Sequence, residues 1–220
     1  MPYIYSEFKD VNKNVVPNEY ATQSGAELYI DEAVDGDLKE KVIKFASGEE
    51  VKYDKLILGL GSHPFVSPIP GRDLKNVFTV KKDENVLQDI YDALNRSTNI
   101  VIIGGGFIGA EIGEQFSNIP GKNVTIVEVP PHCLLLAMEE EFAVMAENRL
   151  KDAGINVLTN ASAKAINGNG SVESVELTTG EKIPADMVLI AIGAAANVDL
   201  AKKLGLEVDM EMGIQVDKYM

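Results

Sequence analysis

The 220-residue sequence has few of the residues that build metal centres and disulfide frameworks. Its only cysteine is Cys133, so the chain can form neither an internal disulfide nor a Cys-x-x-Cys metal or redox motif. Its two histidines, His63 and His132, are too few for a histidine-rich metal site. We therefore expect no metal-binding residues.

Positive charge and long apolar runs are also scarce. Lys and Arg number 20 against 34 Asp and Glu, a net charge of −14, and no basic cluster occurs. Because nucleic acid is held by clustered Lys and Arg, we exclude it as a partner. The apolar runs fall short of the roughly 18 residues of a membrane helix, and no signal peptide is visible. We expect a soluble, cytoplasmic protein with no membrane partner.

The first 80 residues have a β-like pattern. Short runs at 28–30, 42–45 and 51–53 are rich in strand formers, and the apolar run at 55–59 predicts a buried strand that ends at glycines. The prolines between residues 64 and 70 then predict a stiff, extended connection, which is the best candidate for a domain boundary.

Strands and helices alternate from residue 81 onward. Helices are predicted over 83–95, 107–117 and 139–153. The apolar residues expected to face inward from the last helix are Phe142, Met145, Ala146, Leu150 and Ala153. Apolar strands are predicted at 100–103, 124–127, 155–158 and 188–192, with a polar hairpin around 167–170. This order predicts an α/β fold, a Rossmann-like doubly wound parallel sheet with a β-meander insertion.

A glycine-rich motif lies between the strand at 100–103 and the helix at 107–117. Gly104-Gly105-Gly106-Phe107-Ile108-Gly109 matches G-x-G-x-x-G. Gly104 permits the tight turn, Gly106 leaves room for a pyrophosphate against the backbone, and Gly109 allows close packing of helix on strand. The helix N-terminus offers free N–H groups to the phosphates. The motif predicts a dinucleotide site.

Glu128 stands at the end of the next strand. A carboxylate there can accept hydrogen bonds from both adenosine ribose hydroxyls, and it repels the 2′-phosphate of NADPH. No Lys or Arg follows between Val129 and Phe142 to offset that repulsion. We therefore expect NAD(H) as the cofactor, with a merely solvated strand end as the alternative for Glu128.

Four blocks of sequence give the chain a family resemblance. They are residues 53–62, 68–71, 102–111 and 185–193, the last followed by Asn197. Together they resemble the FAD-dependent pyridine nucleotide-disulfide oxidoreductases, nearest to the branch of NADH oxidases and coenzyme A-disulfide reductases. The resemblance implies that residues 1–80 are a partial FAD-binding domain segment. It implies that residues 81–220 are an NAD(H)-binding domain with the start of a returning FAD-domain segment.

The resemblance also implies roles for single residues. In the family the central glycine motif binds NADH over the flavin, the acid matching Glu111 lies near the nicotinamide, and Gly193 sits beside the same ring. The turn at Leu60-Gly61 corresponds to a flavin contact, although the family has Thr-Gly there. Ala194-Ala195-Ala196 departs from a more polar run of the family. Glu111 also has a plain alternative, as an acid in the first turn of its helix.

Parts of the family pattern are missing. No G-x-G-x-x-G for FAD precedes Gly104, the chain starts as though just past the family's redox cysteine, and it stops before the Gly-Asp segment that holds FAD. We expect a fragment that contains no catalytic residue, does not retain FAD, and self-associates through an exposed apolar face. The complete enzyme would transfer hydride from NADH to FAD, and the sequence does not identify the final electron acceptor.

Other interpretations remain open. The chain could be a nucleotide-binding module without turnover, or a degenerate remnant that binds nothing. Cys133 matches no redox position of the family and is predicted to be a packing or surface thiol, and both histidines are predicted to be loop residues. The acidic run at 139–141 fits a helix N-terminus.

Overall fold

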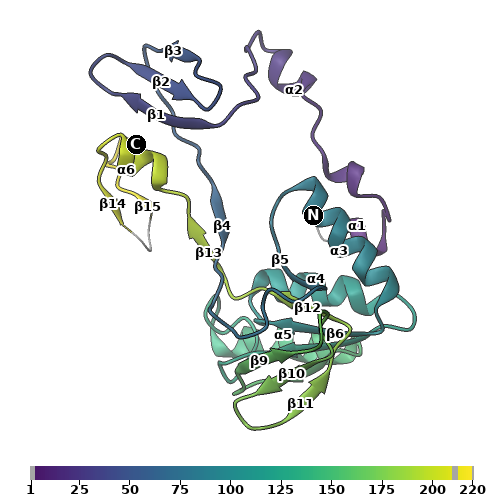
Figure 1. Ribbon diagram of the computed structural model, residues 1–220. Helices are drawn as coiled ribbons and strands as arrows, with labels where there is room; N and C mark the ends of the chain where they lie inside the picture. Colours follow the sequence, from purple (N-terminus) through teal and green to yellow (C-terminus); the bar gives the residue numbers. More distant parts are fainter. Residues whose placement is uncertain (1–2, 210–212, 220) are drawn as a thin grey trace. The chain divides into compact units, whose positions relative to one another are not determined.

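The computed structural model describes residues 3–209 and 213–219, which form two compact units (Figure 1). The first unit combines Met1–Val15 with Pro64–Gly193, and the second combines Val16–His63 with Ala194–Met220. The predicted division into 1–80 and 81–220 concerned the cofactor that each part binds rather than compactness, and it stays a prediction.

The first unit is built on a five-stranded parallel sheet with the strand order β5-β12-β6-β7-β8. Strands and helices alternate through β6 (Asn99–Ile103), α4 (Phe107–Ser117), β7 (Asn123–Val127), α5 (Glu140–Asp152) and β8 (Asn156–Leu158). It then returns to the other side of β6 through β12 (Met187–Ile190), which also pairs with β5 (Val77–Thr79). The strand order therefore reverses between β6 and β12, and such a reversal opens a crevice at the carboxyl ends of the strands.

Different layers cover the two faces of this sheet. Ile100 and Ile102 of β6 pack toward α3 (Glu84–Arg96), α4 and the N-terminal pieces α1 (Tyr3–Ser6) and η1 (Val11–Asn14). Val101 and Ile103 pack toward the antiparallel meander β9 (Ala163–Asn167), β10 (Ser174–Leu177) and β11 (Lys182–Pro184). The expected α/β fold with a parallel sheet and a meander is confirmed, with the meander occupying the face where a doubly wound sheet has helices.

The second unit contains a three-stranded antiparallel sheet of β1 (Ala33–Asp37), β2 (Val42–Phe45) and β3 (Glu50–Lys52). Its other elements are α2 (Glu19–Thr22), β4 (Ser62–Pro64) paired with β13 (Ala194–Ala196), α6 (Asp199–Lys203), and the pair β14 (Val208–Asp209) and β15 (Gly213–Ile214). A turn at residues 46–48 joins β2 to β3.

Two predicted strands are wrong. Residues 28–30 and 55–59 are irregular, and Ile57 is 92% exposed. Burial still alternates along 56–60, with the leucines less exposed than Ile57 and Gly59. The segment thus has the side-chain pattern of a strand, but no described strand pairs with its backbone.

The predicted inward face of α5 is also wrong in part. Phe142 is 51% and Met145 is 68% exposed, whereas Ala143, Glu147 and Leu150 are buried. The small side chain of Ala143 and the hydrogen-bonded carboxylate of Glu147 both face inward. A pattern of large apolar residues does not predict the burial of either residue. The acids at 139–141 lie at the N-terminus of α5, as predicted.

No helix in the described residues has the length and apolar character needed to cross a bilayer.

Candidate dinucleotide site

A cavity of about 600 Å³ opens at the carboxyl ends of β6, β7 and β12. It lies where the strand order of the sheet reverses, the position at which α/β sheets commonly bind ligands. Its walls come from the glycine loop after β6, the loop after β7 and the segment after β12. The lining residues are Gly104, Gly106, Phe107, Ile108, Glu128, Val129, Pro130, His132, Leu134, Leu135, Leu136, Ala137, Ala191, Ile192 and Gly193.

Two glycines of the loop are required by the protein itself. Gly104 has φ +106°, and a Cβ there would lie 2.5 Å from the carbonyl oxygen of Ala191. A Cβ on Gly109 would collide with the carbonyl oxygen of Gly104, so a side chain would push α4 off the loop. These contacts are the tight turn and the close helix–strand packing that the motif predicts.

Gly106 differs because nothing in the chain requires a glycine at this position. It has φ −73° and ψ −171°, which any residue can adopt, and apart from its chain neighbours no atom of the described residues lies within 4 Å of the place that a Cβ would occupy. It caps α4, whose first N–H groups have no intrahelical acceptor. The empty volume beside these donors is what a phosphate group would fill.

The Glu128 carboxylate lies beside the glycine loop. One of its oxygens accepts a hydrogen bond from the Gly105 N–H and the other accepts from the Val129 N–H, at 2.8 Å. Each carboxylate oxygen can accept two hydrogen bonds, so both have a lone pair left for a ligand. The backbone thus fixes the position of this carboxylate in the cavity wall.

Among the described residues that line the cavity there is no Lys or Arg. Its ionisable side chains are Glu128 and His132. A bound anionic ligand would therefore be held by neutral N–H groups and the dipole of α4 rather than by a cation.

The other predicted site residues lie in this cavity, in a neighbouring cavity or in the second unit. Phe107, Ile108 and Gly193 line the cavity, with Phe107 62% exposed and Gly193 at φ +122°. Glu111 is exposed on α4 and lines a neighbouring cavity of about 370 Å³ between α4 and α5. Gly61 belongs to the second unit, where it has φ +65° and its carbonyl accepts from the Asn197 N–H at 3.0 Å.

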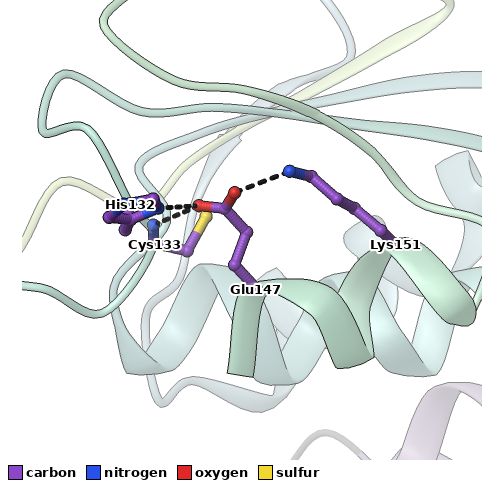
Figure 2. Close-up of polar contacts among 4 residues, drawn as sticks. All are labelled: His132, Cys133, Glu147 and Lys151. Atoms are coloured by element: carbon purple, nitrogen blue, oxygen red, sulfur yellow. Dashed lines mark hydrogen bonds and ion pairs between the residues drawn. The ribbon is translucent and has the colours of Figure 1, made fainter. Parts of the chain in front are cut away.

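Sequence reasoning missed a polar cluster around Glu147 (Figure 2), which includes His132 of the cavity wall. Glu147 of α5 is 5% exposed, and its Oε2 accepts from the Cys133 N–H at 3.1 Å and lies 3.2 Å from His132 Nδ1. Its Oε1 accepts from Lys151 Nζ at 2.7 Å. A Glu four residues before a Lys on a helix was the one available signal, and it indicates a surface pair rather than a buried one.

These contacts control the ionisation of Glu147. Burial alone would raise the pKa of the carboxyl group, but the hydrogen bonds from Lys151, Cys133 and His132 outweigh burial and hold the pKa below its ordinary value. Glu147 is therefore a carboxylate, and it can only accept hydrogen bonds.

Cys133 is fully buried, as a packing thiol would be. Burial, followed by the negative charges of Glu147 and Glu128, raises the pKa of its thiol to about 12. The thiol stays protonated and unreactive at neutral pH. Among the described residues, no group of three or more His, Cys, Asp and Glu is arranged to hold a metal ion.

The chain belongs to the pyridine nucleotide-disulphide oxidoreductase family, whose model matches residues 3–220. The rubredoxin-NAD(+) reductase of Pseudomonas putida is 30% identical over 220 residues, which cover 99% of this chain and 56% of that protein. The NADH oxidase of Methanocaldococcus jannaschii is 29% identical over 232 residues, covering 100% of this chain and 50% of the relative. The chain thus spans about half the length of these curated relatives.

Solved structures agree with this assignment. A ferredoxin reductase of Rhodopseudomonas palustris superposes with a TM-score of 0.86 at 25% identity, covering 95% of this chain and 53% of that one. Members of the family are NAD(P)H-dependent oxidoreductases that use FAD and NAD(H).

Proposed function

We propose that the cavity binds NADH and that this chain is the NAD(H)-binding portion of a flavin-dependent oxidoreductase. The observation that carries the proposal is Gly106, a glycine that no backbone angle and no neighbouring atom of the chain requires. The open space beside Gly106 lies at the N-terminus of α4, where free N–H groups suit a pyrophosphate.

The sheet order supports one direction for the dinucleotide. The glycine loop follows the central strand β6, Glu128 follows β7 on one side, and Gly193 follows β12 on the other. With the pyrophosphate at the glycine loop, the adenosine ribose lies toward Glu128, whose free lone pairs accept from its hydroxyls. The nicotinamide then lies toward Gly193.

The same arrangement favours NADH over NADPH. A 2′-phosphate would lie against the Glu128 carboxylate, and no cation in the cavity wall offsets the repulsion. Glu111 is proposed to act at the nicotinamide end, and Gly61 to contact the flavin, both by the family resemblance alone.

The residues of this chain bind and orient the nucleotide. In the complete enzyme NADH supplies a hydride and FAD accepts it. The final acceptor is a separate property of each relative, since one is a rubredoxin-NAD(+) reductase and another an NADH oxidase. The 220 residues contain a single G-x-G-x-x-G motif, which the NADH site uses. We therefore infer that the chain alone does not retain FAD and does not oxidise NADH in air.

Titration of the purified chain with NADH, followed by calorimetry and by an absorbance spectrum of the protein, tests this proposal. We expect saturable binding of NADH, a colourless protein and no NADH consumption. Failure to bind NADH would refute the cavity assignment. A yellow protein that consumes NADH would refute the inference on FAD.

A further inference from the structure

The loop that follows β7 forms the adenosine side of the proposed NADH site, and the inference below rests on that proposed function. His132, Leu135 and Leu136 of this loop line the cavity beyond Glu128. Leu136 is 91% exposed, although it is a large apolar side chain. A flat heterocyclic base beyond the ribose would cover this apolar surface and meet one polar side chain, His132.

The His132 ring is held in a defined orientation. Its Nδ1 lies 3.2 Å from Glu147 Oε2, and the His132 side chain is 27% exposed. Because Glu147 is ionised and has no proton to donate, Nδ1 must carry the proton of this hydrogen bond. In the neutral imidazole, Nε2 is then an acceptor, and the His132 side chain lines the cavity.

The backbone on both sides of the ring is held as well. Glu147 also binds the Cys133 N–H, and the Leu134 N–H donates to the Gly105 carbonyl at 2.9 Å. Leu134 has φ +63°, a strained conformation for a leucine that these contacts maintain. His132 is therefore anchored to α5 and, through Leu134, to the glycine loop.

We propose that His132 selects adenine as the base of the dinucleotide. Its Nε2 accepts a hydrogen bond from the exocyclic amino group, and Glu147 is the positioning residue that fixes the tautomer. A base that carries a carbonyl in place of this amino group presents an acceptor to an acceptor and is disfavoured.

The test compares NADH with its reduced hypoxanthine analogue, which carries that carbonyl. The wild-type chain should bind the analogue about tenfold or more weakly, since a missing hydrogen bond leaves two acceptors unpaired. His132→Leu should bind both nucleotides with similar dissociation constants, because the discriminating acceptor is gone. His63→Leu, which changes the exposed histidine of the second unit, is the matched control and should keep the full ratio.

The role of Glu147 is tested by Glu147→Gln. Nitrogen-15 NMR should show the proton on Nδ1 of His132 in the wild type and a loss of that preference in the variant. The ratio of the two dissociation constants should fall along with it. A variant that only loosened the fold would weaken both nucleotides equally and leave their ratio unchanged, which would overturn the positioning role.

The outcomes separate this inference from the proposed function. If the wild-type chain binds NADH but does not discriminate, or if His132→Leu still discriminates, the role of His132 is refuted and the NADH site stands. If the wild-type chain does not bind NADH, the proposed function fails and the role of His132 fails with it.

Discussion

Substitution of Gly106 should weaken NADH binding and leave the free energy of unfolding almost unchanged, more clearly than any other change in the glycine loop. A Cβ at Gly106 would have no atom of the described part of the chain within 4 Å, apart from its chain neighbours, and the backbone angles there suit any residue. Gly106→Ala and Gly106→Val lose a favourable N-cap but also restrict the unfolded chain. The free energy of unfolding should therefore change by less than about 1 kcal/mol.

The effect on NADH should be much larger. Each charge-assisted hydrogen bond from the loop to the pyrophosphate is worth about 1.5–3 kcal/mol. Two valine methyl groups in that volume would break at least two such bonds, a loss of about 3–6 kcal/mol or roughly 100- to 20,000-fold in Kd. Alanine, which intrudes less, should weaken binding by about tenfold.

Calorimetric titration and thermal unfolding measure the two effects separately. Gly109→Ala is the opposite case, because its Cβ collides with the Gly104 carbonyl and should lower the unfolding free energy by about 1–3 kcal/mol. Gly59→Ala is the matched control, a glycine of the second unit with equally open surroundings, and it should affect neither property. A folded Gly106→Val variant that binds NADH with the wild-type Kd would refute the assignment of the pyrophosphate site.

Three further outcomes follow from the charged and buried groups. The wild-type chain should prefer NADH to NADPH by about ten- to a hundredfold, and Glu128→Arg should narrow or reverse the preference in calorimetry, whereas equal affinities in the wild type would contradict the ribose role of Glu128. Cys133 should resist thiol reagents at pH 8 in the native state and react once denatured, because burial raises the pKa of its thiol; rapid native labelling would contradict this placement. Glu147 has a lowered pKa when folded, so its contribution to stability is present above the pKa of an unfolded Glu and is lost as the pH falls through the lower folded pKa. Glu147→Gln should therefore be less stable than the wild type at pH 7, with a gap that shrinks on acidification; a gap independent of pH would contradict the contribution of this carboxylate.

The sequence predicted the first unit well because its signals are local. The boundaries of α4 match the prediction, since a strand pattern, a glycine turn and a helix pattern follow one another directly. Gly104 and Gly109 have the packing roles that the motif predicts. Glu128 reaches the glycine loop because adjacent parallel strands end at the same edge of the sheet.

The remaining features depend on contacts between distant parts of the chain. The run at 55–59 is apolar enough for a strand, but a strand also needs a second strand to pair with its backbone. The apolar pattern of one segment does not show whether such a partner is present. Glu147 is polar, so its burial could be inferred only from knowing that the loop at 132–133 contacts it. The apolar stripe through Phe142 and Met145 was predicted as core for the same reason, because the pattern cannot show which side of a helix finds a partner.

A side chain at position 105 would need the space that the Cys133 sulfur fills, so the two positions cannot vary independently during evolution. A Cβ on Gly105 would lie 2.5 Å from the Cys133 sulfur, 3.0 Å from Glu128 Oε2 and 3.3 Å from the Cys133 Cβ. Alanine at position 105 alone would displace the sulfur and, with it, the loop that carries His132. Replacement of the cysteine by alanine first would remove the tightest of these contacts and leave the one with Glu128. The order in which two such mutations arise would decide whether a lineage keeps its nucleotide site on the way.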